Sequence, residues 1–351
     1  MIRVGVVGFG LGGRVFHAPL VASVEGLELA AIVERSGDKA AQRYPGVTIY
    51  RSLEDLLEDK TIDLVVITTP SGNHFEAARK SLEAGKNAVV DKPMAASSAE
   101  IAELMRLAAE RKLLLAPFHN RRWDGDFRTV ERVLGEGQLG RLVEFESYFD
   151  RWRPAPRSAW KEDPKLGGGL LLDIGTHLAD QAMVLFGKPL AVSGDVTRER
   201  DGEGANDSFN VRLRYAGFSV ALGSNCLSSP GRPRFLLRGT KGNYWKWGLD
   251  PQEAELSKVT RIPPGPWGQE APANWGSLNV DVDGCMVTRP VPPIPGDYRL
   301  YYAGVRDAIQ GNAAVPVSVL AAWRTARLLE WAEQSAKERR EIACDWSEEP
   351  A

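Results

Sequence analysis

Residues 2–13 read Ile2-Arg-Val-Gly-Val-Val7-Gly8-Phe-Gly10-Leu-Gly-Gly13, and they decide the fold of this chain. The apolar run over residues 2–7 predicts a buried strand, and residues 14–24 have the composition of a helix. The glycines between them match Gly-x-Gly-x-x-Gly in the strand–turn–helix order that the motif requires. Gly8 permits the tight turn, Gly10 lets the backbone approach a pyrophosphate, and Gly13 lets the helix pack close to the strand. An ordinary structural turn is the alternative, but this context favours dinucleotide binding.

Strands and helices then alternate through the first third of the chain. The predicted strands are residues 27–33, 63–67, 86–90 and 111–117, and a helix is predicted over residues 75–84. The continuous apolar run in residues 63–67 is typical of a parallel sheet that is covered on both faces. We therefore predict an α/β chain whose residues 1–120 form a Rossmann domain with a doubly wound parallel sheet.

The end of the second predicted strand bears on the choice of cofactor. Glu34 stands about 20 residues after the last glycine, where a carboxylate can bind both ribose hydroxyls of NAD. Arg35 and Ser36 would suit the 2′-phosphate of NADP, but Glu34 would repel it. We therefore favour NAD over NADP and leave open the use of both. The residues expected to contact the cofactor are Gly8, Phe9, Gly10, Leu11, Gly13, Glu34, Arg35, Thr69, Pro70, Asn73, His74, Asp91 and Lys92. For His74, a role in starting the helix is the alternative.

Two further places carry reactive side chains. Lys92 follows the strand at 86–90, and ligands of open α/β sheets bind at the carboxyl ends of strands. Its ammonium could stabilise an alkoxide, although a surface lysine is the plainer interpretation. Asp173 and His177, one of only four histidines, stand four residues apart after the glycines 167–169. On a helix they would share one face, and an acid beside an imidazole can move protons. The glycines would let the backbone pass closely under a ligand.

The rest of the chain predicts a second domain of α+β type over residues 121–351. Strand-like runs without long helices between them favour a large, mostly antiparallel sheet. These runs are residues 141–149, 190–197, 208–215, 219–225, 234–239 and 243–247. Helices are predicted over 298–310 and 317–339, and the last helix is a candidate to pack back on the first domain. Residues 250–295 are rich in Pro and Gly, which predicts a long surface excursion.

Assembly and location follow from composition. Trp245 and Trp247 alternate with Lys246, so we expect an apolar sheet face that pairs copies into a homodimer or homotetramer. The net charge of −2 without charged runs argues against a nucleic acid partner. No apolar stretch approaches the roughly 20 residues of a membrane helix, and a strand beginning at residue 2 leaves no room for a signal peptide. Three scattered cysteines indicate a reduced cytoplasmic setting and no metal site.

Taken in order, these motifs resemble one family over essentially the whole chain. They are Gly8-x-Gly10-x-x-Gly13, Thr69-Pro70 with His74, Gly85-Lys86, Asp91-Lys92-Pro93 and Asp173-x-x-x-His177. The chain is similar to the Gfo/Idh/MocA oxidoreductases, which usually have Glu-Lys-Pro where this chain has Asp-Lys-Pro. Residues 15–20, 118–127 and 149–154 resemble the scyllo-inositol dehydrogenase branch, which includes NADP-dependent enzymes. Glu34 departs from the small residue expected in that branch.

The resemblance implies an NAD(P)-dependent dehydrogenase that acts on the CH–OH carbon of an inositol-like cyclic polyol or sugar, bound between the domains. It implies that Lys92 and His177 flank the reacting carbon and that Asp173 binds a substrate hydroxyl or orients the pair. The expected substrate-binding residues are Asn120, Trp123, Arg151, Trp160, Asp173 and His177. The alternatives are a keto-sugar, anhydro-sugar or dihydrodiol as substrate, or a dinucleotide-sensing regulator without catalysis.

Overall fold

The computed structural model describes residues 1–156, 163 and 168–350. The chain divides into two compact units, each built from three segments. The first unit holds residues 1–123, 251–268 and 297–323, and the second holds 124–250, 269–296 and 324–351. The first unit ends close to the predicted boundary at 120. It also includes the two later segments 251–268 and 297–323, so the second unit is not the continuous stretch 121–351 that the sequence predicts.

The sheet of the first unit is parallel throughout. Its strands are β1 (Ile2–Val7), β2 (Leu27–Val33), β3 (Thr48–Tyr50), β4 (Leu64–Ile67), β5 (Asn87–Val90) and β6 (Leu115–Pro117). They lie in the order β3-β2-β1-β4-β5-β6. The order reverses between β1 and β4, and ligands of such sheets bind at this switch point, beyond the carboxyl ends of the strands. The predicted doubly wound Rossmann sheet is confirmed.

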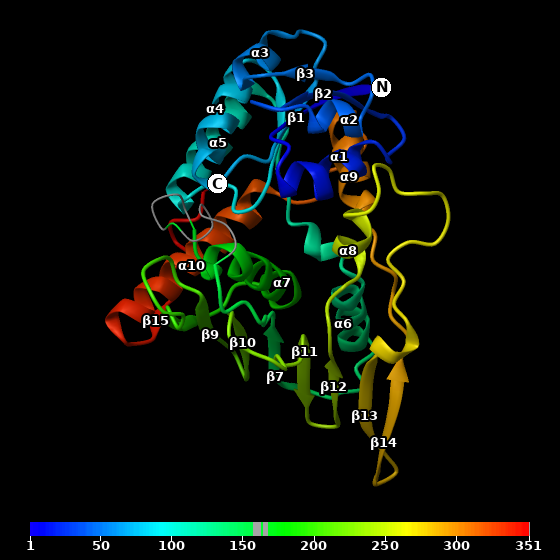
Figure 1. Cartoon of the computed structure of the whole chain (residues 1–351). Helices are drawn as coiled ribbons and strands as arrows, with labels where there is room; N and C mark the ends of the chain where they lie inside the picture. The colour runs from blue at the N-terminus through cyan, green and yellow to red at the C-terminus, as the bar shows by residue number, and fades with distance from the viewer. Residues whose placement is uncertain (157–162, 164–167, 351) are drawn as a thin grey trace. The chain divides into compact units, whose positions relative to one another are not determined.

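Helices cover both faces of this sheet (Figure 1). They are α1 (Ala18–Val21), α2 (Lys39–Arg43), α3 (Leu53–Glu58), α4 (His74–Glu83), α5 (Ser98–Arg111), α8 (Gln252–Leu256) and α9 (Arg299–Ile309). The late helix α9 belongs to this unit because its apolar face carries Tyr301, Tyr302 and Val305, all fully buried with α1 and β1 in one core. That burial explains why the first unit includes residues 297–323, which lie far along the chain.

The second unit contains a nine-stranded sheet. Its strands are β7 (Leu142–Tyr148), β8 (Ala191–Thr197), β9 (Ser208–Tyr215), β10 (Phe218–Asn225), β11 (Phe235–Gly239), β12 (Gly242–Lys246), β13 (Gly276–Val282), β14 (Cys285–Val291) and β15 (Ile342–Ala343). The order is β14-β13-β12-β11-β7-β10-β9-β8-β15. β7 and β10 run parallel and the other neighbours run antiparallel. The mostly antiparallel sheet is confirmed.

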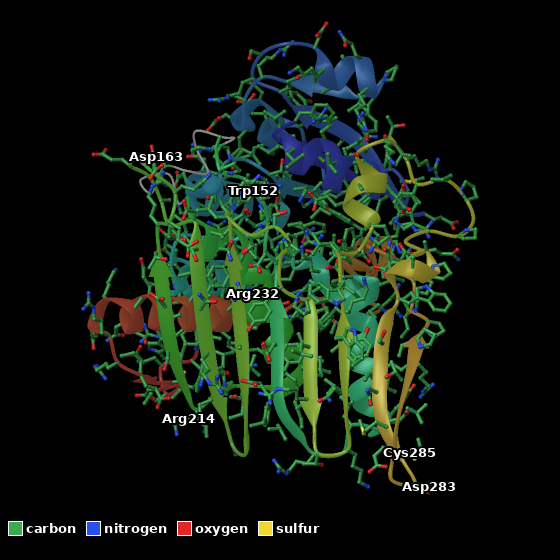
Figure 2. The ribbon with its side chains drawn as sticks, turned by 60° about the horizontal axis from the view of Figure 1, so that its bottom comes forward. Trp152, Asp163, Arg214, Arg232, Asp283 and Cys285 are labelled. Carbon is green, nitrogen blue, oxygen red and sulfur yellow. The ribbon has the colours of Figure 1, made fainter. Side chains whose placement is uncertain are left out.

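The hairpin β13–β14 corrects the prediction of an irregular excursion over 250–295. Residues 276–279 alternate between buried and partly exposed, and the turn at Asp283-Gly284 has positive φ at both residues (53° and 83°). Two positive φ values suit the right-handed twist of a hairpin, and Asp-Gly is a preferred pair for such a turn. Figure 2 shows Asp283 and Cys285 at the tip. The prolines around the hairpin obscured a signal that the sequence contained.

The nine-stranded sheet has one covered and one open face. α6 (Gly125–Gly135), α7 (Thr176–Phe186) and the part of α10 (Val319–Glu338) from residue 324 onward supply the core on the covered face. Figure 2 looks onto the open face, where charged side chains lie over the central strands. Glu144 of β7 pairs with Arg212 at 3.2 Å and with Arg238. The face expected to be apolar from Trp245 and Trp247 therefore carries paired charges on its central strands, while Trp247, just beyond β12, is 53% exposed.

Candidate active site

The glycine turn after β1 is closed on the sheet side and open on the other. Gly8 has φ +101°, and its carbonyl accepts a hydrogen bond from Thr68 Oγ1 at 2.9 Å. A Cβ added to Gly13 would lie 2.0 Å from the Gly8 carbonyl oxygen, so no larger residue fits there. A Cβ added to Gly10 would meet nothing within 4 Å. This arrangement fits a dinucleotide, because the open side at Gly10 is where the pyrophosphate is expected to approach.

The segment after the glycines is helical, as predicted, but in two parts. Gly12–His17 forms a π-helical turn, which leads directly into α1. Single π-helical turns occur frequently at functional sites. Beyond the end of the neighbouring strand β4, the Thr69 hydroxyl is buried and makes no hydrogen bond with any residue that the structure describes. A buried hydroxyl without a partner is costly, so a polar ligand at this edge of the sheet would satisfy it.

The segment after β2 shows how Glu34 is held. The Glu34 side chain is 8% exposed, and its Oε2 accepts the backbone N–H of Ala40 at 3.0 Å. Arg51 donates to the carbonyls of Glu34 and Gly37 and so ties the two ends of this loop together. Arg35 is exposed. The carboxylate therefore has a defined place at the edge where an adenosine ribose would bind.

Asp91 connects the glycine turn to Lys92. Its Oδ1 accepts the Lys92 backbone N–H at 2.8 Å, and its Oδ2 lies 3.5 Å from Nε2 of His17. A Cβ on Gly12 would come within 2.8 Å of that same Oδ2. Burial works to raise the pKa of Asp91, but the contact with His17 and the neighbouring Lys92 and His74 outweigh it and lower the pKa to about 2. The carboxylate is therefore charged at neutral pH.

His74 holds two loops together. Its side chain is 2% exposed, its Nδ1 lies 2.7 Å from the Pro93 carbonyl and its Nε2 lies 2.8 Å from the Thr69 carbonyl. A contact between either ring nitrogen and the cofactor would require one of these contacts to break. The geometry favours the alternative, a structural role at the start of α4. Pro70 and Asn73, in the same loop, are exposed.

In the second unit, Asp173 and His177 lie on consecutive helical turns. Asp173 belongs to a π-helical turn over Leu171–Gly175, and His177 is the second residue of α7. The Asp173 side chain is 22% exposed, whereas His177 is 4% exposed. Gly169 precedes them with φ +127°, and a Cβ there would lie 2.7 Å from the Asn206 side chain. We assigned the glycines to a passing ligand, but Gly169 is required by Asn206 of the protein itself.

Arg151 and Asp173, both predicted to bind substrate, lie close together. Arg151 Nη1 lies 3.9 Å from Asp173 Oδ2, and the guanidinium sits 4.9 Å from the centre of the Phe149 ring. A cation and a carboxylate side by side can donate to and accept from the hydroxyls of a polyol. Trp160, also predicted to bind substrate, and Gly167 lie outside the described residues.

Asn120 and Trp123 are placed in the first unit, on a short 3₁₀ helix over Asn120–Trp123. Asn120 is 4% exposed. The Trp123 ring packs edge-on against Tyr301, with 5.6 Å between the ring centres. This packing uses part of the aromatic surface that we expected a sugar ring to cover.

Two functional candidates escaped the sequence analysis. Arg234, 2% exposed, donates to Gln181 Oε1 at 2.7 Å and to the hydroxyl of Ser147. Gln181 stands one turn after His177 on α7, so the guanidinium ties the histidine-bearing helix to β7. A charged residue at the start of an apolar strand was the available signal. The second candidate is His17, which sits fully buried in the turn after the glycines.

The described residues offer neither a metal cluster nor a membrane helix. Among them, no group of three or more His, Cys, Asp or Glu side chains could hold a metal ion. Within the same part of the chain, no helix has the length and apolar character needed to cross a membrane.

Comparison with known proteins identifies the family. Residues 2–119 match the oxidoreductase family with an NAD-binding Rossmann fold, and residues 127–245 match the GFO/IDH/MocA C-terminal domain. The uncharacterized oxidoreductase YdgJ of Escherichia coli is 40% identical over 96% of this chain and 97% of its own length. The scyllo-inositol 2-dehydrogenase (NADP(+)) IolW of Bacillus subtilis is 33% identical over 97% of this chain and 95% of its own. The solved structure of YPO2259 from Yersinia pestis superposes with a TM-score of 0.93 at 39% identity and covers 98% of this chain and 97% of that one. This chain is therefore a member of the Gfo/Idh/MocA family of NAD(P)-binding oxidoreductases.

Proposed function

We propose that the protein is a dehydrogenase that transfers a hydride between NAD(P) and the CH–OH carbon of an inositol-like cyclic polyol. One observation carries the proposal: Asp91 and Lys92 are the first two residues after β5, and Asp91 lies against the glycine turn. Lys92 thus stands at the carboxyl end of the sheet, where we expect its ammonium to meet a nicotinamide ring. The inositol substrate is supported by IolW, whose name describes a scyllo-inositol dehydrogenase.

The chemistry assigns one task to each polar side chain. When bound, the nicotinamide accepts the hydride from the substrate carbon during oxidation and returns it during reduction. His177 takes the hydroxyl proton as general base in oxidation and gives it back in reduction. Lys92 stabilises the negative charge that develops on the same oxygen. Asp173, held beside Arg151, accepts hydrogen bonds from a neighbouring hydroxyl and orients the ring.

For the cofactor, we propose that NAD is preferred. The Glu34 carboxylate is fixed by Ala40 at the end of β2 and would repel a 2′-phosphate placed there. The name of IolW gives NADP as its cofactor, so we expect this chain and IolW to differ in cofactor preference. The test is kcat/KM with NAD and with NADP for the wild type and for Glu34→Ser. The variant should shift the ratio toward NADP by about tenfold or more, the effect of about 1.4 kcal/mol. An unchanged ratio would contradict this role for Glu34.

We also propose that copies associate as a homodimer or homotetramer through the open sheet face, in a cytoplasmic setting. The paired charges of Glu144, Arg212 and Arg238 could exchange partners with those of a second copy. The free cysteines Cys226, Cys285 and Cys344 support the setting. Light scattering of the wild type and of Arg212→Glu tests the interface, since a charge reversal at a paired position should weaken association. A monomeric wild type would contradict it.

The catalytic proposal is tested by steady-state turnover. Formation of reduced nicotinamide should be seen with at least one inositol, and Lys92→Ala and His177→Ala should each lower kcat by about 100-fold or more. Turnover of a keto-sugar instead would favour the alternative suggested by a Saccharopolyspora spinosa dTDP-3,4-didehydro-2,6-dideoxy-alpha-D-glucose 3-reductase, which is 32% identical over 74% of this chain and 79% of its own length. Tight cofactor binding without turnover on any polyol or sugar would indicate a dinucleotide-sensing regulator.

A further inference from the structure

His17 is fully buried, and both of its ring nitrogens face polar groups of the first unit. Its Nδ1 lies 2.6 Å from the hydroxyl of Tyr302 on α9, and its Nε2 lies 3.5 Å from Oδ2 of Asp91. The Phe118 ring packs on one side of the imidazole, with 4.2 Å between ring centres. Tyr302 is itself fully buried. A histidine that only filled space in this core would have no need of two polar neighbours.

The neighbours of His17 favour one arrangement of its hydrogens. Asp91 is ionised at neutral pH, so its oxygen can only accept, which favours the tautomer of His17 with the hydrogen on Nε2. Burial raises the pKa of Tyr302 well above its usual 10, so the hydroxyl keeps its proton. In this tautomer Nδ1 accepts from the Tyr302 hydroxyl, and the contacts form a relay from Tyr302 through His17 to Asp91. The relay fixes the orientation of the ring, as a hydrogen bond to one nitrogen sets the role of the other.

The relay ends at the backbone of Lys92. Asp91 Oδ1 accepts the Lys92 N–H, and Asp91 Oδ2 lies 3.5 Å from His17 Nε2 in an electrostatic contact. Gly12 packs close to Oδ2, since a Cβ added there would lie 2.8 Å from it. These contacts orient the carboxylate, and the carboxylate in turn holds the start of the Asp91-Lys92-Pro93 turn.

We propose that His17 is a positioning residue, which together with Tyr302 holds Asp91 and through Asp91 sets the place of the Lys92 ammonium. His17 touches neither substrate nor cofactor in this role. The proposal rests on the catalytic function proposed for Lys92. Displacement of a reacting group by about 1 Å can lower the rate by about 100-fold, so losing the contacts that position Lys92 should lower kcat strongly.

The first experiment is a comparison of two neighbouring tyrosines. Tyr302→Phe removes the donor to His17, whereas Tyr301→Phe removes a donor to the Pro117 carbonyl at 3.0 Å from the same helix. Each change deletes one buried hydroxyl, so their effects on stability should be similar. Only Tyr302→Phe should lower kcat, by about three- to tenfold, with the Kd of the dinucleotide unchanged. An equal effect of both variants on kcat, or none of Tyr302→Phe, would overturn the proposal.

The second experiment asks whether His17 acts through Lys92. His17→Leu should lower kcat by about 10- to 100-fold in the wild type but by less than about twofold in Lys92→Ala, because residues that act as a unit are not additive. His17→Gln keeps a donor and an acceptor and should recover part of the rate. The same factor in both backgrounds would show a merely structural role and would overturn the proposal. If His17→Leu does not fold, the tyrosine comparison decides.

The third measurement does not depend on activity. The chain has four histidines, so their imidazole ¹⁵N resonances can be assigned with single variants. His17 should carry a hydrogen on Nε2, and Tyr302→Phe should shift its Nδ1 resonance while Tyr301→Phe should not. The opposite tautomer would overturn the relay alone. Near-wild-type turnover of Lys92→Ala would instead overturn the proposed function, and with it the task assigned to the relay.

Discussion

Two alanine substitutions in the glycine turn separate folding from cofactor binding. A Cβ at Gly13 would lie 2.0 Å from the Gly8 carbonyl oxygen and 2.9 Å from Thr68 Oγ1, whereas a Cβ at Gly10 would meet no atom within 4 Å. Gly13→Ala must therefore push the π-helical turn away from β1. Gly10→Ala leaves the free protein unstrained and places a methyl group only where the pyrophosphate is expected to approach.

The magnitudes follow from these distances. Forcing a methyl group into a packed contact typically costs about 1–3 kcal/mol, so Gly13→Ala should lower Tm by several degrees, at about 2–4 °C per kcal/mol. Gly10→Ala should leave the Tm of the free protein within about 1 °C of the wild type. A similar overpacking cost in the complex would raise the dinucleotide Kd by about 10- to 100-fold.

Thermal unfolding with and without dinucleotide measures both effects. At a dinucleotide concentration of 100 times the wild-type Kd, bound ligand stabilises the wild type by about 2.7 kcal/mol. For a variant with a 100-fold higher Kd, the same concentration gives only about 0.4 kcal/mol. Gly10→Ala should therefore match the wild type in the absence of ligand but lose about half or more of the ligand-induced rise in Tm. A full rise in Gly10→Ala would refute the assignment of this turn to the pyrophosphate.

Three further predictions concern buried charges. Because the pKa of Asp91 is lowered in the folded state, its carboxylate stabilises the fold above its usual pKa of 3.8 and loses that contribution as pH falls toward about 2. In urea unfolding, the difference in free energy of unfolding between the wild type and Asp91→Asn should therefore shrink by about 1 kcal/mol between pH 5 and pH 3. Asp207→Asn should cost about 3–5 kcal/mol in unfolding free energy, because it removes the partner of the buried Arg200 at 2.6 Å. Arg234→Met should cost a similar amount, since the fully buried Asp126 lies 3.7 Å from that guanidinium; a loss under about 1 kcal/mol in either variant would contradict this.

The sequence was most informative where one local rule decides the structure. The alternating residues 208–215 were predicted as a strand with the bounds that β9 has. The glycine turn was assigned residue by residue, and the structure gives Gly8 and Gly13 the geometry expected of them. In each case the pattern of neighbouring residues carries the physical constraint.

The sequence was least informative where the structure depends on distant residues. Nothing near His74 indicates that its ring would face the carbonyls of Thr69 and Pro93. Tyr302 meets His17 across most of the chain, and the membership of α9 in the first unit depends on that core. The hairpin at Asp283-Gly284 is different, because its turn pair was readable and was masked only by the prolines around it.

The most direct test of the central claim follows the hydride itself. A cyclic polyol deuterated at its CH–OH carbons is incubated with the enzyme and oxidised dinucleotide, and the reduced dinucleotide is analysed by mass spectrometry and NMR. The account predicts one deuterium at C4 of the nicotinamide per turnover, and loss of this transfer in Lys92→Ala and His177→Ala. Reduced dinucleotide without the label, or full transfer in both variants, would contradict it.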